Sequence, residues 1–186
     1  LGTQMKATGE VMAIDRSFEA ALNKAVRSLE VGGKSLLWER PEWRGGGEFP
    51  LHATDERLWA LMAALRRGAQ TMDLSRQTGI DPWFIEQLAG IVDLEKKVRR
   101  FGLPATPGAF RQLKAAGFSG SRLAALTGKT EHEVRAARRA LDVRPVYKRI
   151  DTCAAEFESF TPYMYGSFEG ECEAAPTSRA KVVILG

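Results

Sequence analysis

Apolar residues recur every three or four positions through the middle of the sequence. Between residues 54 and 141 the pattern is continuous, as in Leu58, Leu61, Met62 and Leu65. This spacing places the apolar side chains on one face of a helix. An earlier stretch has the same spacing from Asp15 to Leu29. The sequence therefore predicts a mainly α fold.

Start and stop signals divide the helical stretch. Asp81-Pro82 and Thr106-Pro107 each combine a capping side chain with proline at the first helical position, and glycines at 68, 102 and 117 follow apolar runs. Thr130 and Glu133 have the spacing of a capping box. These signals predict several short helices rather than one long one.

The helical stretch is similar to itself after a shift of 49 positions. Gly68 then aligns with Gly117, Thr78-Gly79 with Thr127-Gly128, and Asp81 with Thr130. One interpretation is a helical bundle of two similar units, each too small to form a core alone. The alternative is that small helical units share caps and glycine stops without being repeats.

The flanks of this region have different patterns. Residues 32 to 54 hold glycines, prolines, Trp38 and Trp43, and predict a long loop packed down by its tryptophans. Residues 9–14, the aromatic stretch after Pro145 and residues 182–185 predict short extended or strand segments at both ends. The last is expected to be a buried strand, because its residues are all apolar.

Composition adds few constraints. The chain has 186 residues, 44% of them hydrophobic and 27% charged, as in ordinary globular proteins. Two cysteines argue against a disulfide scaffold and favour a cytoplasmic protein. No apolar run reaches the roughly 20 residues that span a bilayer, and no signal peptide is recognisable. Because the sequence begins at Leu1 and ends at Gly186 after an apolar run, we expect a fragment of a longer protein.

Charge is unevenly distributed along the chain. Residues 1–95 carry a net charge of −3, residues 96–149 of +11 and residues 150–186 of −4. The basic unit at 122–141 has helix-turn-helix spacing and carries Arg135, Arg138 and Arg139, which suit a DNA-binding protein. Alternatively, these arginines pair with acidic segments of the same chain.

The sequence contains no residue pattern that is typical of a catalytic or metal-binding site. His52 and His132 each stand alone, and Cys153 and Cys172 lack metal-ligand spacing. The Gly45-Gly46-Gly47 run lacks the Lys-Ser/Thr of a phosphate loop. The acidic residues at 169–173 are interpreted as a solvated face. We therefore predict no catalytic, cofactor-binding or metal-binding residue.

One run is specific enough to indicate a family. Asp151-Thr152-Cys153-Ala154-Ala155-Glu156 resembles the central segment of the large subunit of glutamine-dependent carbamoyl-phosphate synthase. The runs at 80–84, 110–118, 145–149 and 171–174 resemble the same subunit in the expected order. Within the run, Asp151, Thr152, Cys153 and Glu156 are taken as structural motif residues.

The resemblance implies three pieces of a larger enzyme. Residues 1–38 would end the first, carboxyphosphate-forming synthetase half. Residues 39–150 would form a helical oligomerisation domain. Residues 151–186 would cross over into the first strand of the second, carbamoyl-phosphate-forming half. The family's ATP, Mg and K sites lie in ATP-grasp cores outside these residues, so the fragment itself is expected to bind no cofactor and to be inactive.

The resemblance also implies function and partners. The parent is an ATP-dependent ligase that makes carbamoyl phosphate from bicarbonate, glutamine-derived ammonia and two ATP, for pyrimidine and arginine biosynthesis. Its partners would be other large subunits and a glutaminase small subunit, with no membrane partner, and nucleic acid becomes an unfavoured alternative. Candidate interface residues are Trp83, Phe84 and Arg100, although Phe84 lies on the apolar stripe and is expected to be buried.

Overall fold

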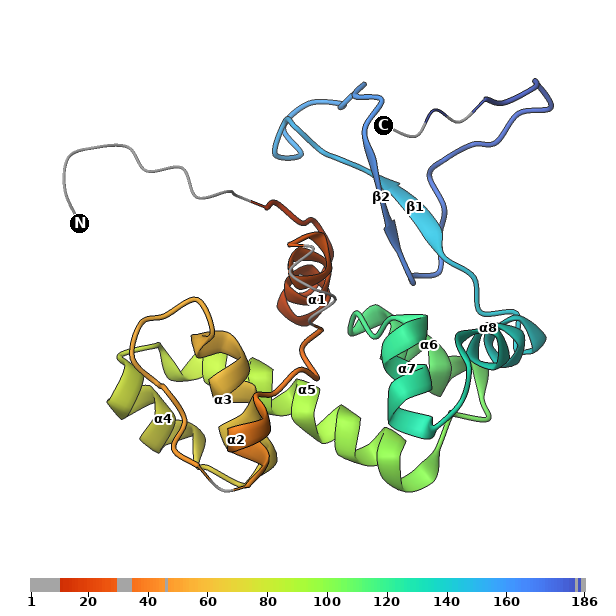
Figure 1. The fold of residues 1–186 in the computed structure, drawn as a ribbon. Helices are drawn as coiled ribbons and strands as arrows, with labels where there is room; N and C mark the ends of the chain where they lie inside the picture. Colours follow the sequence, from red (N-terminus) through yellow and green to blue (C-terminus); the bar gives the residue numbers. More distant parts are fainter. Residues whose placement is uncertain (1–10, 30–34, 46, 183, 185–186) are drawn as a thin grey trace.

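The computed structural model describes residues 11–29, 35–45, 47–182 and 184, and its described part is mainly helical (Figure 1). Two short strands near the C-terminus are its β-structure. The elements are α1 (Phe18–Ser28), α2 (Pro41–Arg44), α3 (Arg57–Arg66), α4 (Thr71–Thr78), α5 (Pro82–Phe101), α6 (Pro107–Ala115), α7 (Gly120–Thr127), α8 (Glu131–Ala140), β1 (Val146–Arg149) and β2 (Met164–Ser167). The prediction of a mainly α fold is confirmed.

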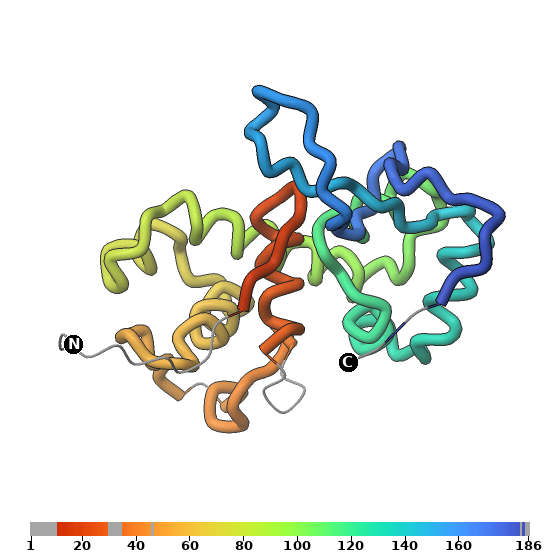
Figure 2. The backbone as a smooth tube through the Cα atoms, turned by 90° about the horizontal axis from the view of Figure 1, so that it is seen from above, coloured from red at the N-terminus to blue at the C-terminus, as the bar shows by residue number. Residues whose placement is uncertain are grey.

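Helix α5 is the long element that connects the two ends of the molecule. Its 20 residues span about 30 Å, with α3 and α4 at one end and α6, α7 and α8 at the other (Figure 1). The predicted start is confirmed, since the Asp81 side chain accepts from the Trp83 amide and Pro82 occupies the first position. Gly102 ends the helix with φ +77°. Helix α1 stands between the two ends, as the view from above shows (Figure 2).

The two helical units repeat in the succession and bounds of their helices. Helices α4 and α7 lie 49 positions apart and end in left-handed glycines, Gly79 at φ 70° and Gly128 at φ 66°. The hydroxyl groups of Thr78 and Thr127 donate to carbonyls four residues back, over 2.7 and 2.8 Å. The units differ in their last helix, because α5 has 20 residues and α8 has 10.

Helix α3 does not have the single apolar stripe that its sequence predicts. Residues 59–65 are all buried, so the helix is covered on every side. The covering element is the segment predicted as a loop, which contains α2. Its Trp43 is buried and packs edge-on with Trp38, and Trp38 packs edge-on with Trp59 of α3. The prediction that tryptophans pack this segment down is thus confirmed.

Helix α1 begins three residues later than predicted. Ser17, rather than Asp15, is its N-cap, and the serine hydroxyl accepts from the Ala20 amide at 3.2 Å. Asp15 instead forms an ion pair with Lys24 at 2.8 Å. The Lys24 ammonium also donates to the Gly166 carbonyl at 2.6 Å, which ties α1 to strand β2.

The C-terminal part is extended, as predicted. Strands β1 and β2 pair antiparallel with Val146 opposite Ser167. The expected buried strand at 182–185 is not supported, since Val182 and Ile184 are 87% and 90% exposed and outside any strand. Residues 11–14 also form no strand. The remaining residues of these two predicted strands, 9–10, 183 and 185, lie outside the described part of the chain.

Candidate functional site

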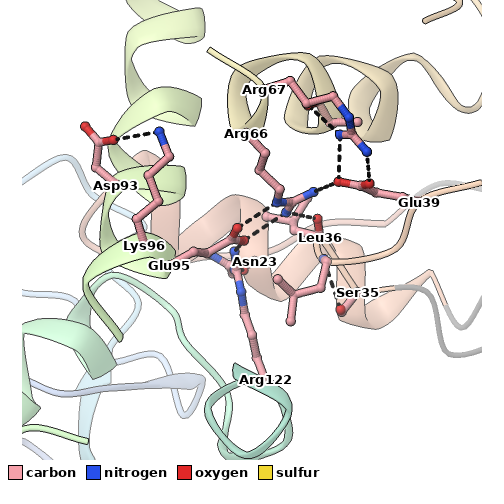
Figure 3. Close-up of polar contacts among 12 residues, drawn as sticks. Asn23, Ser35, Leu36, Glu39, Arg66, Arg67, Asp93, Glu95, Lys96 and Arg122 are labelled. Carbon is pink, nitrogen blue, oxygen red and sulfur yellow. Dashed lines mark hydrogen bonds and ion pairs between the residues drawn. The ribbon is translucent and has the colours of Figure 1, made fainter. Parts of the chain in front are cut away.

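A buried ion network occupies the point where the two helical units meet (Figure 3). Glu95 of α5 accepts from Arg66 of α3 through both oxygens, with Oε2–Nε at 2.7 Å and Oε1–Nη2 at 2.9 Å. Its Oε1 also accepts from Arg122 of α7. The side chains of Glu95 and Arg122 are only 2% exposed. One carboxylate therefore joins a helix of the first unit to a helix of the second.

The network continues from Arg122 into helix α1. The Arg122 guanidinium donates to Asn23 Oδ1 at 2.6 Å, and Asn23 Nδ2 donates to the Ala116 carbonyl at 3.1 Å. Arg27, one turn further along α1, donates to the Gly117 carbonyl at 3.1 Å. Polar groups of α1 thus bind the turn that joins α6 to α7.

At its other end the network fixes the segment before α2. Arg66 donates to Glu39 Oε1 at 2.9 Å and to the Leu36 carbonyl at 2.6 Å. Arg67 donates to Glu39 Oε2 at 2.7 Å. Taken with the contacts to Asn23, the network binds together α1, the covering segment, α3, α5 and α7.

The protonation states of the network follow from burial and pairing. Burial lowers the pKa of Arg122, and this outweighs the attraction of Glu95. Burial acts on Arg66 in the same direction, but hydrogen bonds and charges from Glu95 and Glu39 prevail and raise its pKa. Burial alone would raise the pKa of Glu39, yet its bonds to Arg67 and Arg66 hold that pKa below the ordinary value. The pairing of opposite charges across these helices suits a fixed joint.

Sequence reasoning missed this network, although one signal was present. Glu95 follows Leu88 and Ile91 and precedes Val98 at helical spacing, so it is a charged residue on an apolar stripe. A carboxylate at such a position is buried almost only when it is paired. Its partners Arg66 and Arg122 lie 29 and 27 residues away in sequence, so only the tertiary structure identifies them.

The structure separates the three predicted interface residues. Trp83 and Phe84 lie at the start of α5 and pack edge-on with each other at 5.0 Å between ring centroids. Both rings also contact Phe18 of α1, at 5.5 and 5.4 Å. Arg100 lies about 25 Å away, near the other end of α5, with its guanidinium 5.0 Å from the Phe101 ring. Trp83 and Phe84 are 49% and 44% exposed, so the expectation that Phe84 is buried is wrong.

The family motif forms a turn in the loop between β1 and β2. The Asp151 carboxylate accepts from the amides of Cys153 and Ala155, at 2.8 and 2.7 Å. Ala154 and Ala155 have positive φ angles of 52° and 60°. The Thr152 hydroxyl lies 3.3 Å from that of Ser159, and the Glu156 amide donates to the Cys153 carbonyl at 3.0 Å. In this structure the motif residues shape the loop through hydrogen bonds.

The acidic residues at 169–173 do not form a simple solvated face. Lys148, on β1, is buried and lies 3.0 Å from Glu173, 3.9 Å from Glu171 and 4.0 Å from Glu169. The Arg149 amide and then Lys148 lower the pKa of Glu173. Glu169 also pairs with Arg16, at 2.9 Å. The earlier interpretation missed these pairs because β2 brings the acidic residues back alongside β1.

The basic unit at 122–141 directs much of its charge inward. Arg122 belongs to the buried network, and Arg138 donates to the Val143 carbonyl and lies 5.7 Å from the centroid of the Phe168 ring. Arg135 and Arg139 are exposed. The prediction that these arginines pair with acidic residues of the same chain therefore holds for Arg122, which pairs with Glu95, whereas Arg138 is bound by a carbonyl oxygen.

Other kinds of site were searched for in the described ranges. Among those residues, no three His, Cys, Asp or Glu side chains are grouped so that they could hold a metal ion. Within the same ranges, no helix combines the length and apolar character needed to cross a membrane. Cys153 and Cys172 are both free thiols.

Comparison with known proteins identifies the family. Residues 10–142 match the family described as the carbamoyl-phosphate synthetase large chain, oligomerisation domain. The whole chain is 48% identical to carbamoyl phosphate synthase large chains from Thermomicrobium roseum and Rhizobium meliloti, and covers 17% of each. It is 43% identical to the arginine-specific, chloroplastic large chain from Oryza sativa subsp. japonica, of which it covers 16%.

The chain thus spans about a sixth of the length of these relatives. Nothing in the comparisons supports the DNA-binding alternative. The matched region contains the buried network and both helical units, whereas strands β1 and β2 lie after it. The chain belongs to the family of the oligomerisation domain of the carbamoyl-phosphate synthetase large chain.

Proposed function

We propose that this chain is the segment through which large chains of a carbamoyl-phosphate synthase associate with one another. The observation that carries the proposal is the match of residues 10–142 to a family described as an oligomerisation domain. Two structural features support it. The buried network around Glu95 joins helices α3, α5 and α7, and half-exposed aromatic rings lie at the start of α5.

The associating surface that we propose includes Trp83 and Phe84, with Arg100 as a second contact further along α5. Large aromatic side chains and arginines contribute most to protein interfaces. Trp83 and Phe84 are held edge-on against Phe18, so little side-chain freedom is lost when a partner covers them.

The activity of the whole protein is a further part of the proposal. The names of the relatives support a carbamoyl phosphate synthase, one of them arginine-specific. The reaction that we propose for the whole protein is that of a ligase that makes carbamoyl phosphate from bicarbonate, glutamine-derived ammonia and two ATP, for pyrimidine and arginine biosynthesis. ATP, Mg and K would bind outside these 186 residues, and a glutaminase small subunit would supply ammonia. In this proposal residues 1–38 end one synthetase half, residues 39–150 associate and residues 151–186 lead into the other half. Two free thiols support a cytoplasmic location.

Sedimentation velocity over a concentration series tests the association. We expect the 186-residue chain to form a dimer whose dissociation constant rises at least tenfold in the double variant Trp83→Ser/Phe84→Ser. The matched control is Phe157→Ser, which removes an exposed ring from the loop between β1 and β2. A chain that stays monomeric at the highest concentration contradicts the association, and equal effects of the two variants contradict the surface.

An ATPase assay tests the proposal that this segment associates but does not catalyse the reaction. The pure chain is expected to show no bicarbonate-dependent hydrolysis of ATP, whereas the full-length large chain shows it. Hydrolysis by the chain alone, unchanged after repeated purification, would contradict the non-catalytic role.

A further inference from the structure

A hollow of about 190 Å³ lies between helices α6 and α8 and the residue that follows β2. Its walls include three basic side chains, Lys114 from α6 and Arg135 and Arg138 from α8. The Phe168 ring and the carboxylate of Glu131 also line the hollow. The hollow is separate from the network around Glu95 and from the Trp83 surface.

The cations are held in place by contacts that do not neutralise them. Lys114 donates to the Phe118 carbonyl, and Arg138 donates to the Val143 carbonyl. Both also lie against the Phe168 ring, with Lys114 Nζ 5.0 Å and Arg138 Cζ 5.7 Å from its centroid. An ammonium has three donors and a guanidinium five, so one carbonyl bond leaves donors for a ligand.

Charge around the hollow is unbalanced. Three cations line it against one carboxylate, that of Glu131. Burial, followed by the positive charges of Arg138 and Arg27, lowers the pKa of Lys114 to about 8, and the opposing effect of Glu131 is the smallest of the four. Like charges therefore repel one another here without compensation from a paired carboxylate, in contrast to the arginines around Glu95.

We propose that this hollow binds a small oxyanion, with phosphate as its representative, through Lys114, Arg135 and Arg138. Guanidinium and ammonium groups are the donors that proteins use for phosphate. An anion between these groups would relieve their repulsion and take up donors that the carbonyls leave free. Because the hollow joins α6, α8 and the segment after β2, a bound anion would stabilise the contact between the hairpin and the second helical unit.

Titration with inorganic phosphate tests the site. The thermal unfolding midpoint of the 186-residue chain is measured at pH 7 with increasing phosphate, and with sodium chloride at matched ionic strength to remove general screening. We expect the midpoint to rise with the logarithm of the phosphate concentration once this exceeds the dissociation constant, and chloride not to reproduce the rise. Equal responses to the two salts would overturn the proposal.

Variants on one helix locate the site. Arg135→Gln removes an exposed cation that lines the hollow, and Arg139→Gln removes an exposed cation of the same helix that does not line it. Phosphate affinity, followed by amide chemical shifts in NMR, is expected to fall at least fivefold in Arg135→Gln and less than twofold in Arg139→Gln. Glu131→Gln removes the opposing carboxylate and is expected to increase affinity. Equal losses in the two arginine variants, or weaker binding in Glu131→Gln, would overturn the proposal.

Discussion

The close approach of helix α1 to Gly117 provides the sharpest test of how the two helical units are joined. Gly117 has φ +85°, and a Cβ atom added there would lie 2.8 Å from both Ala20 Cα and Asn23 Cβ of α1. Its counterpart in the first unit, Gly68, has φ +90° and nothing within 4 Å of an added Cβ. The repeat therefore supplies two matched positions, Gly68 and Gly117. An alanine would meet similar backbone strain at both, but it would collide with α1 only at Gly117.

The expected magnitudes follow from these two environments. Alanine in the left-handed region costs about 1 kcal/mol, which both Gly68→Ala and Gly117→Ala incur. Overpacking against a helix backbone adds about 2 kcal/mol, and this applies only to Gly117→Ala. That variant should thus lose about 3 kcal/mol of unfolding free energy in total. For a chain of this size, 1 kcal/mol corresponds to roughly 2–4 °C in the unfolding midpoint.

Urea denaturation followed by circular dichroism measures both variants against the parent chain. We expect Gly117→Ala to lose about three times as much unfolding free energy as Gly68→Ala. Amide hydrogen exchange should show reduced protection in α1 for Gly117→Ala only. Equal losses in the two variants, with unchanged protection of α1, would refute the inference that this turn holds α1 in place.

Three further outcomes are expected. Glu95→Leu should cost about 3–5 kcal/mol in urea denaturation, because the buried guanidinium of Arg122 and the partly buried one of Arg66 lose their partner. Asp93→Asn on the exposed face of α5 should cost under about 0.5 kcal/mol, and equal costs of the two variants would show that the network is not a joint. Trp43→Ala should lose about 3–5 kcal/mol and expose the rings over α3 to a fluorescence quencher; unchanged stability would mean that the covering segment is dispensable. Burial, with the nearby charges of Arg138 and Arg27, lowers the pKa of Lys114 to about 8 from the ordinary 10.5, so the unfolded chain binds more protons between these values. The unfolding free energy should therefore rise with pH over this range, by up to about 3 kcal/mol. Lys114→Met should flatten that rise in urea titrations at pH 7.5 to 10.5, and an unchanged slope would refute the assignment.

Local signals predicted most of the helices correctly. Asp81, Thr106 and Thr130 cap the helices that they were expected to begin. The shift of 49 residues predicted the succession of two units, because caps and left-handed glycines act through neighbours a few residues away. The same locality explains one error. Ser17 and Asp15 are both good caps, and the pairing of Asp15 with Lys24 takes the aspartate away from the helix start.

Contacts between distant segments could not be predicted in this way. Whether α3 has one buried face or is buried all round depends on the segment around Trp43, which the sequence shows only as a loop with tryptophans. The acidic residues at 169–173 could be interpreted as solvated until the pairing of β1 and β2 placed them beside Lys148. The spacing of Glu95 shows that a charge lies on a buried stripe but does not name its partners.

The sequence by itself determined most helix boundaries and the family, and it indicated the repeat, because capping, periodicity and a specific run of residues are all local in the chain. The tertiary structure alone decided which charges are buried together and which aromatic rings remain exposed. The physical reason is the cost of burying a charge. Glu95, Arg66 and Arg122 are stable in the interior only as a set, and that set exists only once three helices and α1 have come together.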